Sequence, residues 1–195
     1  MGHFDELLAK KIEVADLKNP GLGLSNPSGA GAIGTEVAPK VVVTQVGGLI
    51  ETKVYVDLTG LKKANDVGDA IGLDGTADAS LFAWDTSVHG DVIVESSLAC
   101  IELPAAASNN LLDFDVLSAT ATLDYDGDVA GESDAKTLFA AAGNCALGKT
   151  IKDVDVESPA TSGDKVYLCD GATSTGADTF TAGKLILTFK AYKTF

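Results

Sequence analysis

The sequence contains no arginine: all 14 of its basic residues are lysines, against 28 acidic residues in a chain of 195. Arginine is the preferred bidentate reader of phosphate and guanine, and a net charge of −14 repels both DNA and anionic membranes. We therefore expect no nucleic-acid partner and no membrane partner. The chain also lacks an apolar run as long as a membrane span and shows no signal peptide, which predicts synthesis in a cytosol.

Residues that commonly carry catalysis are scarce. The only histidines are His3 and His89, and neither a GxSxG elbow nor an HExxH helix is present. We expect His89 to be an ordinary loop histidine, and the protein to have no enzymatic activity and no cofactor. The three cysteines are too widely spaced for a disulfide framework or a zinc site, and we expect Cys100 and Cys169 to be small buried strand residues.

One acidic run raises the question of a metal site. Asp124, Asp126 and Asp128 stand at alternate positions of the motif DYDGD and could supply oxygen ligands to Ca²⁺. The EF-hand pattern fails, because Val129 occupies the glycine position and Ala135 the position of the bidentate glutamate. We predict an acidic hairpin turn and no metal site, with these three aspartates as the only candidates.

Aromatic residues make up only 6 % of the chain, whereas 21 glycines suit short strands joined by tight turns. The clearest element runs from Gly47 to Leu61, where apolar and polar side chains alternate. This period of two predicts a strand with one buried and one solvent-facing side. The expected buried side consists of Ile50, Thr52, Val54, Val56 and Leu58, and the expected solvent side of Glu51, Lys53, Tyr55 and Asp57.

Similar patterns predict seven or eight strands in all, without a βαβ rhythm. In residues 91–103 we expect Val92, Val94, Leu98 and Cys100 to share one face. A single short helix is expected over residues 135–148, and the apolar run 81–84 is expected to form an exposed contact patch. The predicted fold is all-β: an antiparallel, jelly-roll-like β-sandwich.

Composition divides the chain near Pro39. Residues 1–39 form an expected N-terminal arm with a short amphipathic segment and a glycine- and proline-rich linker, and residues 40–195 the β-sandwich body. The arm cannot build a core of its own, so we expect a partner to cover its apolar side chains. The predicted partner-binding residues are Phe4, Leu7, Leu8, Ile12, Leu22, Leu24 and Ile33.

Three segments carry a family resemblance. Residues 47–72 (GGLIETKVYVDLTGLKKANDVGDAIG), 91–106 (DVIVESSLACIELPAA) and 165–192, with its YL-x-x-G turn and TAGK final strand, resemble structural proteins of marine tailed bacteriophages. The resemblance implies a capsid decoration (auxiliary or cement) protein with a jelly-roll body. Such a protein is expected to be a homotrimer that binds the major capsid protein on the exterior of the virion capsid, after assembly in the host cytoplasm.

Two alternatives stay open. One is a carbohydrate- or host-receptor-binding β-sandwich of the virion, although one tryptophan and four tyrosines provide few aromatic rings for stacking on sugars. The other is a minor head or tail-tube structural protein.

Overall fold

The computed structural model is an antiparallel β-sandwich made of two sheets. Eight of its strands have four or more residues, so the predicted all-β sandwich is confirmed, while the jelly-roll strand order stays a prediction. No helix in the described part of the chain is long and apolar enough to cross a membrane. The structure describes residues 40–63, 65–106, 113–141, 143–153, 157, 162–171 and 176–194.

The larger sheet is built around two strands of fifteen residues, β5 and β10, which pair with each other. Gly47 adopts a φ of +62° in the two-residue turn of the β1–β2 hairpin, a conformation that favours glycine. In sheet order the strands are β1 (Lys40–Val46), β2 (Leu49–Asp57), β10 (Asp178–Tyr192), β5 (Val92–Ala106) and β8 (Thr150–Asp153), and β3 (Lys62–Lys63) pairs with the start of β10.

The alternation predicted for β2 is confirmed with one exception. All five residues of the apolar side, from Ile50 to Leu58, are buried. On the polar side Tyr55 is exposed and Glu51 and Lys53 are half-buried. Asp57 is buried instead, because its carboxylate accepts a hydrogen bond from the Thr59 N–H at 2.9 Å and so caps the turn that ends the strand.

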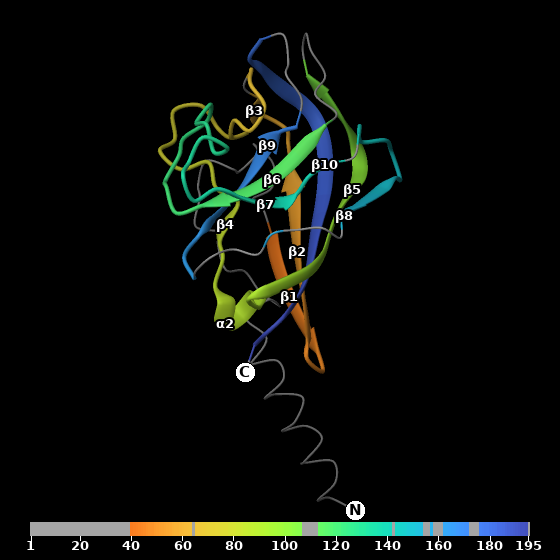
Figure 1. Cartoon of the computed structure of the whole chain (residues 1–195). Helices are drawn as coiled ribbons and strands as arrows, with labels where there is room; N and C mark the ends of the chain where they lie inside the picture. Colours follow the sequence, from red (N-terminus) through yellow and green to blue (C-terminus); the bar gives the residue numbers. More distant parts are fainter. Residues whose placement is uncertain are drawn as a thin grey trace, which may run out of the picture.

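The smaller sheet lies against the inner face of the larger one, and Figure 1 shows its strands overlying β2 and β10. Apolar side chains from both sheets form one core. Ring contacts join the layers: Phe114 lies 6.1 Å from Phe180, and Trp84 meets Phe189 edge-on at 5.6 Å. The strands of the smaller sheet are β4 (Phe82–Ala83), β9 (Lys165–Asp170), β6 (Phe114–Ala119) and β7 (Lys136–Phe139), in that order.

A second, smaller core covers the other side of the smaller sheet. It is made by residues 65–80 and 120–135, here called the acidic cover, which pack on outward-facing side chains of β6 and β9. The Tyr167 hydroxyl donates a hydrogen bond to the Ala121 carbonyl at 2.7 Å and accepts one from the Leu123 N–H at 3.1 Å. The smaller sheet is therefore buried on both faces.

The helix predicted over residues 135–148 is wrong. Residues 136–139 form strand β7, in which Leu138 and Phe139 are fully buried and pair with β6. After the strand, the Ala140 and Ala141 N–H groups donate to the carboxylates of Asp153 and Asp115 rather than to helical carbonyls. Tertiary pairing thus overrides the helix propensity of this alanine-rich segment. The short helix that the structure does have, α2, spans Thr86–His89.

The exposed patch predicted over residues 81–84 is also wrong. Leu81, Phe82 and Trp84 belong to the main core, and the Trp84 indole N–H donates to the Gly90 carbonyl at 2.7 Å. His89, at the end of α2, packs against the Phe82 and Trp84 rings at 5.2 and 5.1 Å. This corner closes one end of the sandwich, so the apolar run does not form an exposed contact patch.

Candidate functional site

The outer face of the larger sheet, which points away from the smaller sheet, is the candidate functional surface. It is formed by the alternate residues of β1, β2, β10, β5 and β8 that do not enter the core. Strand register aligns them in rows: Tyr55 lies opposite Ile186, and Lys190 lies between Glu51 and Glu95. A row of charged residues therefore crosses the middle of this face, with apolar side chains on both sides of it.

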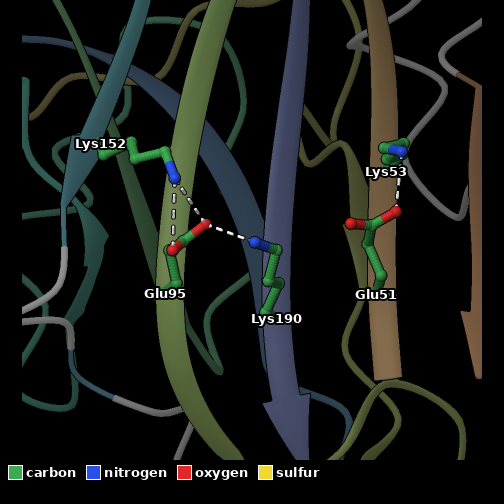
Figure 2. Close-up of polar contacts among 5 residues, drawn as sticks. All are labelled: Glu51, Lys53, Glu95, Lys152 and Lys190. Atoms are coloured by element: carbon green, nitrogen blue, oxygen red, sulfur yellow. Dashed lines mark hydrogen bonds and ion pairs between the residues drawn. The ribbon is translucent and has the colours of Figure 1, made fainter. Parts of the chain in front are cut away.

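Ion pairs hold the charged row together, as Figure 2 shows. The Glu95 carboxylate accepts from Lys190 Nζ at 2.7 Å and from Lys152 Nζ at 3.4 Å, and Lys53 Nζ lies 2.7 Å from Glu51 Oε1. The hydrogen bond from Lys190 lowers the pKa of Glu95, and the same contact raises the pKa of Lys190. Because these groups are solvated, each pair contributes only about 0–1 kcal/mol to stability.

Two exposed apolar patches flank the charged row. The first, called the groove patch, consists of Tyr55, Ile101 and Ile186, and these residues line a shallow groove of about 260 Å³ between β2, β10 and β5. The second, called the hairpin patch, lies beside the β1–β2 turn, where the register aligns its residues in one row. It consists of Val46, Leu49, Tyr192 and Val92.

Two β-bulges in β5 put additional apolar side chains on this face. Between the Glu95–Lys190 and Ile93–Ala191 pairs, β5 has one extra residue, Val94, which is exposed. In the same way Ile101 is the extra residue between the Cys100–Leu185 and Glu102–Lys184 pairs, and its side chain is 51 % exposed. Bulges of this kind re-aim side chains and bend the strand.

These bulges overturn the predicted face of residues 91–103. Leu98 and Cys100 are buried as expected, but Val92 and Val94 are exposed and Ile93 is buried in their place. A strictly alternating strand cannot bury both Ile93 and Leu98, because they are an odd number of residues apart. In the sequence of this strand, apolar residues occupy both odd and even positions, and this pattern indicates that the alternation is interrupted.

The opposite side of the molecule has a different charge. The acidic cover contains nine carboxylate residues and no lysine, whereas the outer face of the larger sheet carries lysine and glutamate side by side. The carboxylates of the cover are Asp66, Asp69, Asp74, Asp78, Asp124, Asp126, Asp128, Glu132 and Asp134. The net negative charge of the protein is thus concentrated away from the outer face.

Within the cover, the three metal candidates are exposed turn residues. The Asp128 carboxylate accepts from the Gly131 N–H at 2.7 Å, and Asp126 adopts a positive φ of 70° while its N–H donates to the Ala70 carbonyl. The Asp124 carbonyl accepts from the Gly127 N–H at 3.2 Å. No group of three or more histidine, cysteine or carboxylate residues in the described ranges is arranged to hold a metal ion.

Buried titratable groups lie inside the sandwich. Asp170, at the end of β9, is fully buried with both carboxylate oxygens unpartnered, and burial raises its pKa to about 8. The nearby Lys63 is equally buried, donates to the Gly176 carbonyl at 2.8 Å and opposes this rise. Asp69 adds a repulsive negative charge. The sequence does not predict that Asp170 is buried, because it shows only an aspartate at the end of a strand.

The histidine and the cysteines are packing residues. His89 Nδ1 accepts a hydrogen bond from the Asp85 N–H at 2.9 Å, and burial lowers the pKa of His89 to about 4. This corrects the expectation of an ordinary loop histidine. Cys100 and Cys169 are buried, as predicted, and so is Cys145, whose pKa burial raises to about 12. A thiol held protonated in this way is a poor nucleophile.

The predicted arm residues Phe4, Leu7, Leu8, Ile12, Leu22, Leu24 and Ile33 lie outside the described residues. The first described strand, β1, begins at Lys40. The boundary between arm and body stays a prediction.

Comparison with known proteins adds no assignment: no family model matches the chain, and no match is found among curated proteins or solved structures.

Proposed function

We propose that the protein is a non-catalytic structural protein of a virion, a phage capsid decoration protein that binds the outside of the major capsid protein shell and stabilises the head. The observation that carries the proposal is the asymmetry of the body. One side is closed by the acidic cover, in which Asp74 and Asp78 pair with lysines of neighbouring strands and the other carboxylates add net negative charge. The opposite side is a charge-balanced sheet face with two apolar patches. A cement protein needs one adhesive face and one face that remains in water.

The asymmetry also suggests an orientation on the particle. Apolar patches of this kind on a soluble protein mark contact surfaces, whereas nine clustered carboxylates resist burial against a partner. The outer face of the larger sheet would therefore face the shell or a neighbouring subunit, and the acidic cover would face solvent. Repulsion between acidic covers opposes association of subunits through this side of the molecule.

The arm is proposed to provide most of the attachment. Each leucine or isoleucine that a partner buries fully contributes roughly 1.5–3 kcal/mol before the entropy of ordering the arm is subtracted. The seven apolar arm residues predicted from sequence are therefore sufficient to anchor a body that itself touches the shell over a limited area.

The proposed assembly on the head is a homotrimer with a jelly-roll body, as the resemblance implies. Since Leu81, Phe82 and Trp84 are buried, the contacts between subunits are assigned to the hairpin patch, where Val46 is 80 % exposed. Light scattering of the purified protein gives the oligomeric state directly. A monomer at every concentration would contradict a trimer that forms before attachment.

The function is tested by adding the purified full chain to undecorated shells assembled from the major capsid protein of the same genome. We expect saturable co-sedimentation, density at repeated positions outside the lattice in cryo-electron maps, and a higher temperature of shell disassembly. A variant lacking residues 1–38 should bind far less. Shells that remain bare at saturating protein would contradict the proposal, and full occupancy without the arm would move the attachment to the body.

A second candidate is a carbohydrate-binding role, favoured by one observation. Tyr55 and Tyr192 are 41 % and 48 % exposed on the same sheet face, where rings can stack on sugars. In this case the protein would bind immobilised glycans, and the Tyr55→Ala and Tyr192→Ala variants would lose that binding. Glycan binding without shell binding would favour this candidate over the decoration role.

A further inference from the structure

The groove patch is an apolar hollow that no side chain in the described part of the body fills. Its lining is almost entirely apolar, and the Lys184–Glu102 ion pair, with a distance of 2.7 Å, lies at its rim. Its volume of about 260 Å³ is below the roughly 300–1,000 Å³ of typical small-molecule sites, and it lacks the convergent polar groups that orient such ligands. Apolar side chains of a peptide segment suit it better.

The arm joins the body beside this groove. The first residue of β1, Lys40, lies opposite Tyr55 of β2, and Tyr55 lies opposite Ile186 of β10. Neighbouring strands are about 4.8 Å apart, so the point where the arm leaves the body is about 10 Å from the centre of the groove.

The length of the arm allows its apolar segment to return to the groove. Between Ile12 and Lys40 lie 27 residues of mainly glycine- and proline-rich chain. A chain of this length and composition has an expected root-mean-square span of about 30 Å, which exceeds the distance it must bridge. The effective concentration of the segment at its own groove is then in the millimolar range. A separate, unassociated copy would have to reach that concentration against the repulsion of two chains of charge −14.

The chemistry of the segment matches the groove. Phe4, Leu7, Leu8 and Ile12 recur at helical spacing and form one apolar stripe. A short amphipathic segment is not stable alone in water and needs an apolar surface on which to lie. The groove lies beside the point at which the arm begins.

We propose that, in the free protein, the apolar stripe of residues 4–12 lies in the groove patch of its own chain. The arm is then stored on the outer face of the larger sheet, and its apolar residues are released only when a partner competes for them. This inference concerns the unattached subunit, so it holds or fails independently of the capsid proposal.

Disulfide trapping in the full chain tests this arrangement. The test variant combines Leu8→Cys with Ile101→Cys, and the matched control combines Leu8→Cys with Val46→Cys. Val46 is exposed at the far end of the hairpin, about 20 Å from the start of β1, so a freely moving arm reaches it as well. The native cysteines are buried and are monitored in the Leu8→Cys single variant. Under mild oxidation, mass spectrometry separates links within a chain from links between chains.

We expect the Leu8–Ile101 pair to link within the chain at least about tenfold faster than the Leu8–Val46 pair, because binding in the groove raises the local concentration of the arm there. Adding Leu7→Asp to the test variant should reduce its rate to that of the control. Equal rates for the two pairs would overturn the proposal. Predominant links between chains would overturn it too, and would identify a second copy as the occupant of the groove.

Discussion

The two sheets of the sandwich differ in sequence pattern and in surroundings: β2 and β10 alternate between buried and more exposed residues, whereas β6 and β9 are buried at nearly every position. The smaller sheet is buried on both faces, by the main core on one side and by the acidic cover on the other, whereas no described connection covers the outer face of the larger sheet. Buried faces contribute to stability, and an open face with apolar patches is available for binding. The comparison therefore assigns stability to one side of the molecule and interaction to the other.

The largest expected effect comes from truncating a tyrosine on each side. Tyr167, fully buried under the acidic cover, loses both its ring packing and two hydrogen bonds in the Tyr167→Ala variant. We expect a loss of about 3–5 kcal/mol in the free energy of unfolding, measured by urea denaturation. Tyr55→Ala, on the open face, is the matched control and should cost less than about 1 kcal/mol. Similar losses for both variants would mean that the outer face is also part of the stabilising core.

A pH effect of intermediate size is expected from Asp170. Its pKa of about 8 in the folded protein lies above the ordinary value of 3.8, so the folded state retains a proton that the unfolded state has released between these pH values. The unfolding free energy therefore falls as the pH rises from about 4 to 8. Asp170→Asn removes this pH dependence. Between pH 4 and pH 8, the unfolding free energy of the variant should therefore rise by roughly 2–4 kcal/mol relative to that of the wild type. A constant difference between the two thermal unfolding profiles from pH 4 to pH 8 would show that Asp170 is not the buried proton-binding group.

Smaller effects should separate the two faces of a single strand. On β2, Val56 points into the core and Lys53 toward solvent. Val56→Ala should cost about 1–3 kcal/mol of unfolding free energy and Lys53→Ala about 0.5 kcal/mol, as measured by thermal denaturation. Equal costs would contradict the assignment of the faces, and with it the distinction between core and open surface.

The smallest effect is expected for the charged row. Glu95→Gln removes the carboxylate shared by Lys190 and Lys152, but all three side chains are solvated. The free energy of unfolding of the variant should fall by less than about 1 kcal/mol in urea denaturation, and this loss should be smaller still at high salt. A large, salt-independent loss would show that the row is a structural network rather than a part of the binding surface.

Local patterns in the sequence predict where strands form, whereas contacts between distant segments determine which of their side chains are buried. The alternation of β2 predicts its buried side, because each side chain on that side meets the same core along the whole strand. The bulge residues Val94 and Ile101 escape prediction, since a bulge depends on the register of the partner strand.

The same reason explains the errors at residues 135–148 and 81–84. Whether an alanine-rich or an apolar run becomes a helix, a strand or a surface depends on which strand it meets. The acidic run 124–128 was correctly predicted as a turn, but nothing local indicates that the connection containing it closes one side of the smaller sheet.

The assignment of binding to the open face is tested most directly by placing the same charge on each side of the body. Val92 on the hairpin patch and Val67 on the acidic cover are 41 % and 48 % exposed, so Val92→Glu and Val67→Glu are matched variants that should both fold normally. Occupancy of undecorated shells is then measured by co-sedimentation. We expect Val92→Glu to weaken binding at least about tenfold, because its carboxylate is forced into the apolar contact between subunits of the attached trimer, and Val67→Glu to bind like wild type. Wild-type binding by Val92→Glu, or an equal loss for Val67→Glu, would contradict the assignment.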